Sequence, residues 1–280
     1  MVDFVYSEKN PEAPLAYCEI MAMHSRLELL LIGKGEERAR ALCEEAERTT
    51  LGLEKIFDRH NPDSEISALN TAEGGIHVGD ELYFALELCE QFRRATDGFF
   101  DISACSPVPT SDRGAYSLGG EDHCACLSGK GIVLDFGGFA KGYALEKIRS
   151  SLASAGIRDA LLNFGNSSAV GMGKHPFGPC WIINSDNSTR SFRLCDSAVS
   201  ISGRSPDGKD HIINPASGKS AKAGKNIAVE GKSALVCEIL STALYAAPES
   251  SRAEIIKNFE GYSFMSTTHQ LKTDGLATAR

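Results

Sequence analysis

The segment Ile132-Val133-Leu134-Asp135-Phe136-Gly137-Gly138-Phe139-Ala140-Lys141-Gly142-Tyr143 decides how the rest of this chain is interpreted. Its three apolar residues predict the end of a buried strand, and Asp135 then caps the turn. The paired glycines let the backbone approach a neighbour closely, and the apolar spacing from Ala140 onward predicts a helix. A strand, a glycine turn and a helix start together indicate an anion site, because unpaired N–H groups and the helix dipole point outward together.

This glycine turn differs from two common nucleotide-binding motifs. A Walker loop needs Gly-Lys followed by Ser or Thr, whereas here Lys141 precedes Gly142 and Tyr143 follows. The dinucleotide pattern G-x-G-x-x-G is also absent. A tight strand-to-helix turn without a ligand therefore remains the alternative interpretation of the glycines.

Composition indicates a globular protein with a sizeable core. The chain has 280 residues, 42% of them hydrophobic and 24% charged, which is compatible with one large domain or two modest ones. The net charge of −8 argues against a nucleic-acid or anionic-membrane partner. No apolar run approaches the roughly 18 residues of a membrane span.

The N-terminal stretch MVDFVYSEKNPEAP is polar and acidic, without the apolar core of a signal peptide. We expect residues 1–15 to be a disordered lead-in and residues 16–280 to form the domain. The expected location is cytoplasmic, or exported if the true N-terminus is missing. The nine cysteines are an odd, scattered set, which favours reduced thiols, and His123-Cys124-Ala125-Cys126 lacks the second close pair of a structural zinc site.

The first half of the chain predicts both strands and helices. Residues 16–33 predict one long or two short strands, and residues 36–57 an amphipathic helix. A second helix is expected from Gly79 to Ala95, and a short buried strand over residues 99–103. Residues 104–129 are interpreted as irregular, without a regular element.

The second half is richer in strands. A strand running into a polar glycine turn is expected over residues 160–168, and further strands over 181–184, 191–194, 198–203 and 227–229. Helices are predicted for 233–247 and 253–259, followed by a hairpin that begins at 262–265 and turns at Asp274-Gly275. Strands outnumber helices and do not strictly alternate with them, which favours an α+β fold.

Four polar clusters interrupt the apolar elements: residues 135–142, 163–168 and 202–214, and the pair Glu238 and Thr242. That pair is four residues apart on a predicted helix, on a face other than the apolar one. With a nearby carbonyl it suits a hard cation, although such a pair is also typical of a solvated helix side. His211 is a candidate base or a structural histidine. No Gly-x-Ser-x-Gly elbow or His-Glu-x-x-His motif is present.

Taken together and in order, these motifs resemble the ApbE-type FAD:protein FMN transferases over nearly the whole chain. The resemblance implies an ApbE-like, T-fold-like α+β fold with mainly antiparallel sheets packed with helices. The pieces that carry it are Met23, residues 63–70 (DSEISALN), residues 97–101 (DGFFD), residues 134–142 (LDFGGFAKG), Ser202-Gly203, residues 211–218 (HIINPASG) and Glu238 with residues 240–244 (LSTAL).

The resemblance also implies a role for each cluster. The glycine turn would lie against the FAD pyrophosphate, and Ala140, Glu238 and Thr242 would hold Mg²⁺. The catalytic residues would be His211, Glu238 and Lys141, with His211 accepting or guiding the hydroxyl proton. The residues expected to bind FAD are Met23, Ser64, Glu65, Asn70, Asp135, Gly137, Gly138, Lys141, Asn163, Gly165, Ser202, Gly203 and His211.

The implied reaction moves FMN from FAD to a Thr or Ser hydroxyl of an acceptor flavoprotein and releases AMP. A Mg²⁺-dependent FAD pyrophosphatase and an FAD storage protein are the alternatives. This chain departs from the family at Glu238, where relatives commonly carry Asp, at Gly165-Asn166, usually Gly-Gly, and at Met23-His24-Ser25, usually Met-Gly-Thr. The motifs leave the oligomeric state open.

Overall fold

The structure is a computed structural model that describes residues 2–33, 35–108, 114–120, 122–185, 191–204, 211–221, 224–267 and 271–272. Within these residues the chain forms six helices and sixteen strands. All paired strands described are antiparallel, so the predicted α+β class with mainly antiparallel sheets is confirmed.

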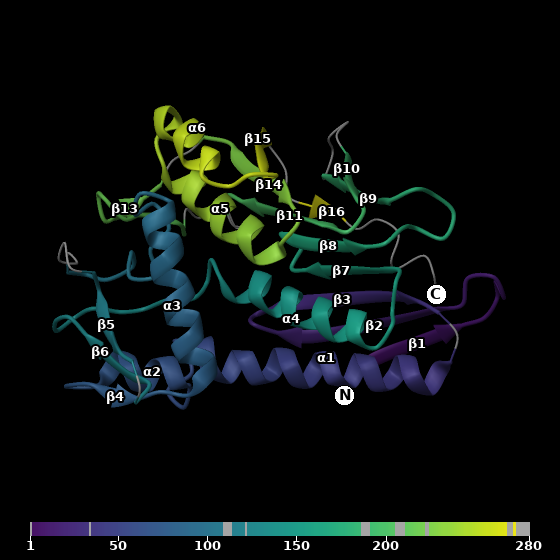
Figure 1. Ribbon diagram of the computed structural model, residues 1–280, viewed down its shortest axis with the longest axis horizontal. Coiled ribbons are helices and arrows are strands. Elements are labelled where there is room, and N and C mark those ends of the chain that lie inside the picture. Colours follow the sequence, from purple (N-terminus) through teal and green to yellow (C-terminus); the bar gives the residue numbers. More distant parts are fainter. Residues whose placement is uncertain are drawn as a thin grey trace.

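One eight-stranded sheet forms the centre of the molecule (Figure 1). The two strands expected in residues 16–33 pair as neighbours in it, and the strand before the polar glycine turn lies next to them. In spatial order the strands are β1 (Asp3–Ser7), β2 (Leu15–Ala22), β3 (Ser25–Ile32), β7 (Ala160–Phe164), β8 (Ser168–Met172), β11 (Ser197–Ser202), β14 (Asn226–Gly231) and β15 (Ser263–Thr267).

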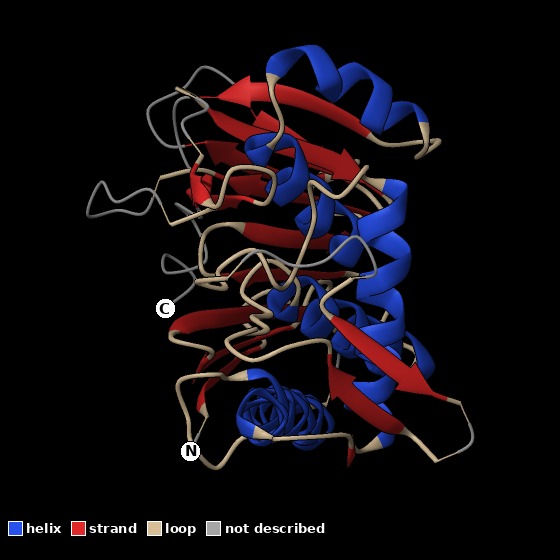
Figure 2. Cartoon of the chain, turned by 90° about the vertical axis from the view of Figure 1, so that its left-hand side faces the viewer, coloured by secondary structure: helices blue, strands red, loops and turns tan. Residues whose placement is uncertain are grey.

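Three helices cover one face of this sheet: α1 (Glu36–Phe57), α4 (Ala140–Ser154) and α5 (Ala234–Ala246) (Figures 1 and 2). All three were expected close to these bounds. The apolar stripe of α1 is buried against the sheet, as its spacing predicts. Helix α5 is apolar almost all round, because it lies between the sheet and α4 and so has little solvent-facing surface.

A small sheet covers the opposite face of the central sheet, in the order β10 (Ser191–Leu194), β9 (Trp181–Ser185) and β16 (Leu271–Lys272). Its Trp181 is buried there and donates its indole N–H to the Met172 carbonyl at 2.8 Å. Strand β16 pairs with β9, whereas β15 pairs with β14 of the central sheet. The predicted turn at Asp274-Gly275 lies outside the described residues.

The remaining elements lie mostly at one end of the sheet and beside α5 (Figure 1). Helix α3 and the sheet β4–β6–β5 pack next to α2 at that end. The elements are α2 (Glu65–Thr71), β4 (Ile76–His77), α3 (Asp80–Ala95), β5 (Tyr116–Gly119), β6 (Cys124–Leu127), β12 (Ile213–Asn214), β13 (Lys219–Ser220) and α6 (Glu249–Lys257).

The expectation of a disordered lead-in over residues 1–15 is wrong. Residues 3–7 form β1, which pairs along its whole length with β2. The guanidinium of Arg40 on α1 lies 4.3 Å from the ring centre of Phe4, a cation–π contact that fastens this edge strand to the helix. Backbone pairing and this contact offset the polar composition that suggested disorder.

Three local predictions around the central motif are also wrong. Residues 99–103 form turns, because Asp101 Oδ1 accepts the backbone N–H of Ser103 at 2.7 Å and so closes a local loop. Residues 104–129 contain the strands β5 and β6. The sequence did not predict them, because both strands are short and the segment is rich in Cys and Gly. Residues 132–134 do not form a strand, because the Leu134 N–H is donated to Asn70 Oδ1 at 2.8 Å and not to a neighbouring strand.

Gly142, in the first turn of α4, tests how closely α4 and α5 are packed. A Cβ at this position would lie 2.7 Å from the Ala234 carbonyl oxygen and 2.9 Å from Leu235 Cα, both on α5. We expect Gly142→Ala to lower the free energy of unfolding by about 1–3 kcal/mol in urea titrations, because backbone atoms must separate. The control Gly52→Ala, exposed within α1 and without neighbours within 4 Å, should be neutral or stabilising. Equal effects of the two substitutions would contradict this packing.

Candidate active site

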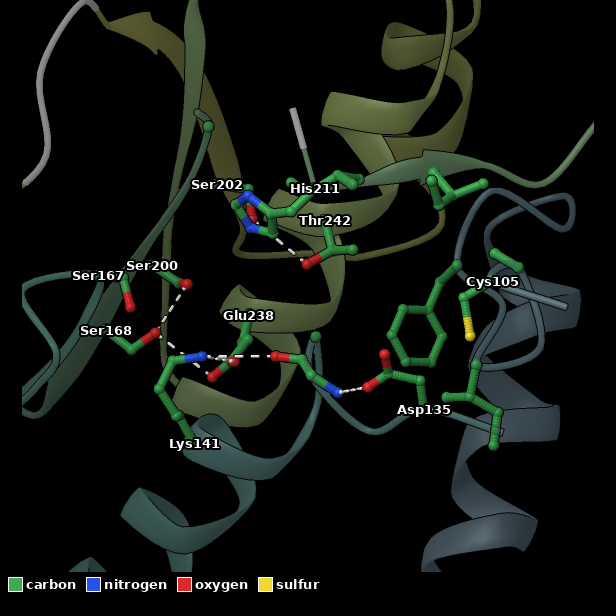
Figure 3. A pocket seen from close by; sticks show the side chains of 18 of the residues that line it. Cys105, Asp135, Lys141, Ser167, Ser168, Ser200, Ser202, His211, Glu238 and Thr242 are labelled. Carbon is green, nitrogen blue, oxygen red and sulfur yellow. Dashed lines mark hydrogen bonds and ion pairs between the residues drawn. The ribbon is translucent and has the colours of Figure 1, made fainter. Parts of the chain in front are cut away.

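A cavity of about 470 Å³ opens where the glycine turn before α4 meets α5 and the central sheet (Figure 3). Its wall is made by segments far apart in the sequence: the β2–β3 turn, residues 99–105, the glycine turn, the β7–β8 turn, the end of β11, residues 211–215 and one side of α5. The fold thereby gathers the four predicted polar clusters at one place. Polar side chains form much of the wall, as an ionic ligand requires.

The glycine turn is held by Asp135 and Phe136. Asp135 Oδ1 accepts the backbone N–H of Gly137 at 2.8 Å, and Oδ2 accepts the Arg59 Nε–H at 2.8 Å. The ring of Phe136 stacks on Phe57 of α1 at 4.6 Å between centroids. Asp135 thus closes the turn as the sequence predicts. Phe139, at the N-cap of α4, provides no side-chain hydrogen bond to the helix.

The glycine turn lies directly against α5. A Cβ on Gly138 would lie 3.0 Å from both Cγ2 and Oγ1 of Thr242, so no larger residue fits without displacing that side chain. Gly142 makes the second close approach, and its Cβ would also lie 3.0 Å from Cβ of Glu238. Glycine at these positions lets the start of α4 and the Glu238–Thr242 side of α5 share one wall.

Glu238 is a buried carboxylate paired with a lysine. Only 3% of Glu238 is exposed, and its Oε1 lies 2.9 Å from Lys141 Nζ, which also donates to the Gly137 carbonyl at 3.4 Å (Figure 3). The alternative interpretation of Glu238 and Thr242 as a solvated helix side is excluded for Glu238, because α5 is covered on nearly all sides. A buried carboxylate needs a cation, and in this structure Lys141 is that cation.

A chain of hydroxyl groups connects the sheet to α5. Ser168 Oγ is 2.9 Å from Ser200 Oγ and donates to Glu238 Oε2 at 3.4 Å. Ser202 Oγ is 2.8 Å from Ser241 Oγ and 3.3 Å from Thr242 Oγ1. These hydroxyl groups and the Glu238 carboxylate form a site suited to phosphate groups and hard cations.

The structure places most of the residues predicted from sequence on this cavity. Ala140 instead lines a smaller adjoining cavity of about 180 Å³. The predicted residues on the main wall are Met23, Asp135, Gly137, Gly138, Lys141, Gly165, Ser202, Gly203, His211, Glu238 and Thr242.

Three predicted residues, Ser64, Glu65 and Asn70, lie outside the cavity wall. Ser64 is the N-cap of α2, and the Glu65 carboxylate accepts the backbone N–H of Gly79. Asn70 donates to the Leu134 carbonyl at 3.0 Å and accepts its N–H, which fixes the segment leading into the turn. Their geometry is that of structural residues around the site.

Asn163 is buried within the central sheet and also lies outside the wall. Its Nδ2 donates to Glu28 Oε2 at 2.8 Å and to Asn166 Oδ1 at 3.0 Å. Tyr17 donates its hydroxyl to Glu28 Oε1 at 2.9 Å from the neighbouring strand. This polar network braces the β7–β8 turn that carries Gly165.

Several residues of the wall were not among the predicted site residues, among them Ser200, His24 and Cys105. Ser200 precedes Ser202 by two positions on β11, so period-2 alternation predicts that both face the same side. His24 and Cys105 gave no comparable signal. Burial raises the pKa of the Cys105 thiol, and the Asp135 carboxylate raises it further, so this cysteine is a protonated, weak nucleophile near neutral pH.

The His123–Cys126 segment lines neither this cavity nor the smaller one, and His123 makes contacts elsewhere. His123 Nδ1 is 2.9 Å from Asp80 Oδ1, and its ring stacks on Tyr83 with centroids 4.5 Å apart. Among the residues that the structure describes, no three His, Cys, Asp or Glu side chains are grouped to hold a metal ion. In the same part of the chain no helix is long and apolar enough to cross a membrane.

A sequence model described as the ApbE family matches residues 21–265. No curated protein sequence matches the chain. Three solved structures share the fold. A flavin transferase ApbE from Vibrio cholerae is 17% identical with a TM-score of 0.74, over 97% of this chain and 96% of that one. An ApbE protein from Thermotoga maritima is 18% identical with a TM-score of 0.77, over 95% and 98%. The apo form of a Pseudomonas stutzeri flavinyl transferase ApbE is 21% identical with a TM-score of 0.75, over 91% and 95%.

The Lys141–Glu238 pair provides a test of the site electrostatics. Lys141→Met should lower the free energy of unfolding by about 1–3 kcal/mol, because a buried carboxylate loses its cation while Lys141 itself is partly exposed. The double variant Lys141→Met/Glu238→Gln should recover much of that loss in the same urea titration. A double variant no more stable than Lys141→Met would show that the two side chains are not coupled.

Proposed function

The chain belongs to the ApbE family, and from this we propose that it transfers FMN from FAD to a Thr or Ser hydroxyl of an acceptor protein and releases AMP. The observation that carries the proposal is the shared wall of the glycine turn and the Glu238–Thr242 side of α5. It places a glycine backbone, a lysine and a row of hydroxyls around one cavity, which suits a pyrophosphate.

The donor atoms also fit Mg²⁺. Glu238, Thr242 and the serine hydroxyls supply hard oxygen ligands, and Mg²⁺ in nucleotide sites takes one or two carboxylates and completes its shell with phosphates and waters. We propose that Glu238 and Thr242, with the Ala140 carbonyl, hold it. When bound, Mg²⁺ supplies a Lewis acid that neutralises pyrophosphate charge. Lys141 would then exchange Glu238 for a phosphate oxygen.

In the proposed reaction the acceptor oxygen attacks the phosphorus that bears the riboflavin. A new P–O bond forms to the acceptor, the P–O bond to the bridging oxygen breaks, and AMP leaves with that oxygen. His211 takes the proton of the acceptor hydroxyl, since it lines the same cavity as Lys141 and Glu238. Lys141 and the N–H groups at the start of α4 stabilise charge on the phosphates, and the close-packed wall fixes their alignment.

Incubation of the purified chain with FAD, Mg²⁺ and an acceptor domain that carries a target threonine tests the proposal. AMP release with flavin covalently on the acceptor supports transfer. Release of FMN and AMP irrespective of acceptor would instead support a pyrophosphatase, and bound but unchanged FAD would support storage. Replacement of the acceptor threonine by alanine is the control.

Glu238→Gln is expected to lower the transfer rate by about a hundredfold or more, because it removes the charged ligand proposed for Mg²⁺. FAD binding, measured by flavin fluorescence, should survive better than in Gly138→Val, whose side chain would overlap Thr242. Normal transfer by Glu238→Gln would show that this carboxylate is not part of the reaction.

Removal of divalent metal with a chelator should abolish transfer, and added Mg²⁺ should restore it. The physical reason is that the cavity of an acidic protein presents few cations to the doubly charged pyrophosphate of FAD. Chromatographic measurement of AMP gives the rate. Undiminished AMP release in excess chelator would argue that Lys141 alone supplies the positive charge.

A further inference from the structure

The smaller cavity lies beside the main one and shares part of its wall. It is lined by the β2–β3 turn, by the end of α1 from Glu54 to His60, and by the glycine turn and start of α4. The residues common to both cavities are Met23, His24, Asp135, Gly137 and Lys141. His24 therefore stands on one side of the junction of the two cavities, and Lys141 also borders both.

The turn that carries His24 has an unfavourable backbone conformation. Met23 has φ 50° and His24 has φ 54°, and both belong to the left-handed region that β-hairpin turns normally fill with Asn or Gly. Two consecutive non-glycine residues there cost on the order of 1–3 kcal/mol each, and such strain is concentrated at functional sites. The surrounding structure must hold the turn in place.

Two carboxylates at the C-terminal end of α1 hold it, Glu54 in the last turn and Asp58 at the C-cap. Glu54 Oε1 accepts the backbone N–H of Met23 at 2.6 Å. Four residues later, Asp58 Oδ2 lies 3.4 Å from His24 Nε2, and the edge of His60 faces the His24 ring with centroids 6.3 Å apart. The imidazole is thus oriented by Asp58, although 73% of the His24 side chain is exposed to the cavity side and solvent.

The same end of α1 also holds the opposite wall. Phe57 stacks on Phe136, and Arg59 pairs with Asp135 at 2.8 Å, so both contacts reach the glycine turn. One helix end therefore fixes the separation between His24 and the segment that bears Lys141. A ligand held between these walls meets His24 in a reproducible position.

We propose that His24, oriented by Asp58, is a further substrate-contacting residue, and that its imidazolium form strengthens binding of the anionic dinucleotide at the junction of the two cavities. The inference rests on the proposed function, since it takes FAD as the ligand. Because Asp58 meets Nε2, Nδ1 is the nitrogen that donates to a phosphate oxygen. Histidine changes charge between about pH 5 and 8, whereas the pyrophosphate stays anionic throughout this range.

The charged side chains near the glycine turn are already paired, so we assign the contact with the anionic ligand to His24. Arg59 is already paired with Asp135, and Lys141 with Glu238, so the two permanent cations nearest the glycine turn each face a carboxylate. The ionisable groups that line the smaller cavity with His24 are Glu54 of α1, Asp58, Arg59 and His60 directly after α1, and Asp135 and Lys141 from the glycine turn and α4.

Binding of FAD to the wild-type chain and its variants, measured by flavin fluorescence at fixed Mg²⁺ between about pH 5.5 and 8, tests the proposal. Wild type should bind about three- to tenfold more tightly at the acidic end, a modest factor because His24 is exposed. His24→Gln should remove most of this gain. Asp58→Asn, which keeps the shape of the side chain but removes the carboxylate that orients His24, should reduce the gain.

His77→Gln is the matched control, because His77 is exposed on β4 and lines neither cavity. It should retain the wild-type dependence on pH. A pH dependence in His24→Gln equal to that of wild type overturns the inference and leaves FAD transfer standing. A uniform loss of affinity at every pH would make His24 a structural residue and also overturns it. Failure of wild type to bind FAD at any pH overturns the proposed function and this inference together.

Discussion

The contact between the glycine turn and α5 is the constraint on which the site depends. Gly138 and Gly142 leave no room for side chains, so Thr242 and the backbone at Ala234 approach the start of α4 within van der Waals distance. Two elements separated by roughly a hundred residues of sequence thereby form one wall. Without this approach, Lys141 would not reach the buried carboxylate of Glu238.

The C-terminal end of helix α1 supports two walls of the site. The apolar stripe of α1 packs against the sheet. Glu54 in its last turn and Asp58 at its C-cap contact the β2–β3 turn, and Phe57 and Arg59 contact the glycine turn. The helix end is therefore both the end of a core element and a brace between two walls. Rigidity of the core is transmitted to the cavity in this way, because packed elements move together rather than independently.

Charge in the cavity is balanced in pairs. Asp135 faces Arg59 and Glu238 faces Lys141, so the acidic protein presents neither an excess of carboxylates nor strong free cations around the glycine turn. The negative charge of a bound pyrophosphate must be balanced by cations that exchange their carboxylate partner for a phosphate oxygen, and by groups that gain positive charge. The net compensation of charge therefore matters more than any single ion pair.

The sequence by itself determined the long amphipathic helices, the α+β class and the order of the polar motifs, because these depend on local periodicity and on turn chemistry. Most of the site residues that it predicted through the ApbE resemblance lie on the cavity wall. Only the tertiary structure decided that residues 3–7 join the sheet, that Asn70 and Asn163 support the wall from behind, and that Glu238 is buried beside Lys141. Those outcomes depend on backbone pairing and burial between segments distant in sequence, and local patterns carry no information on either.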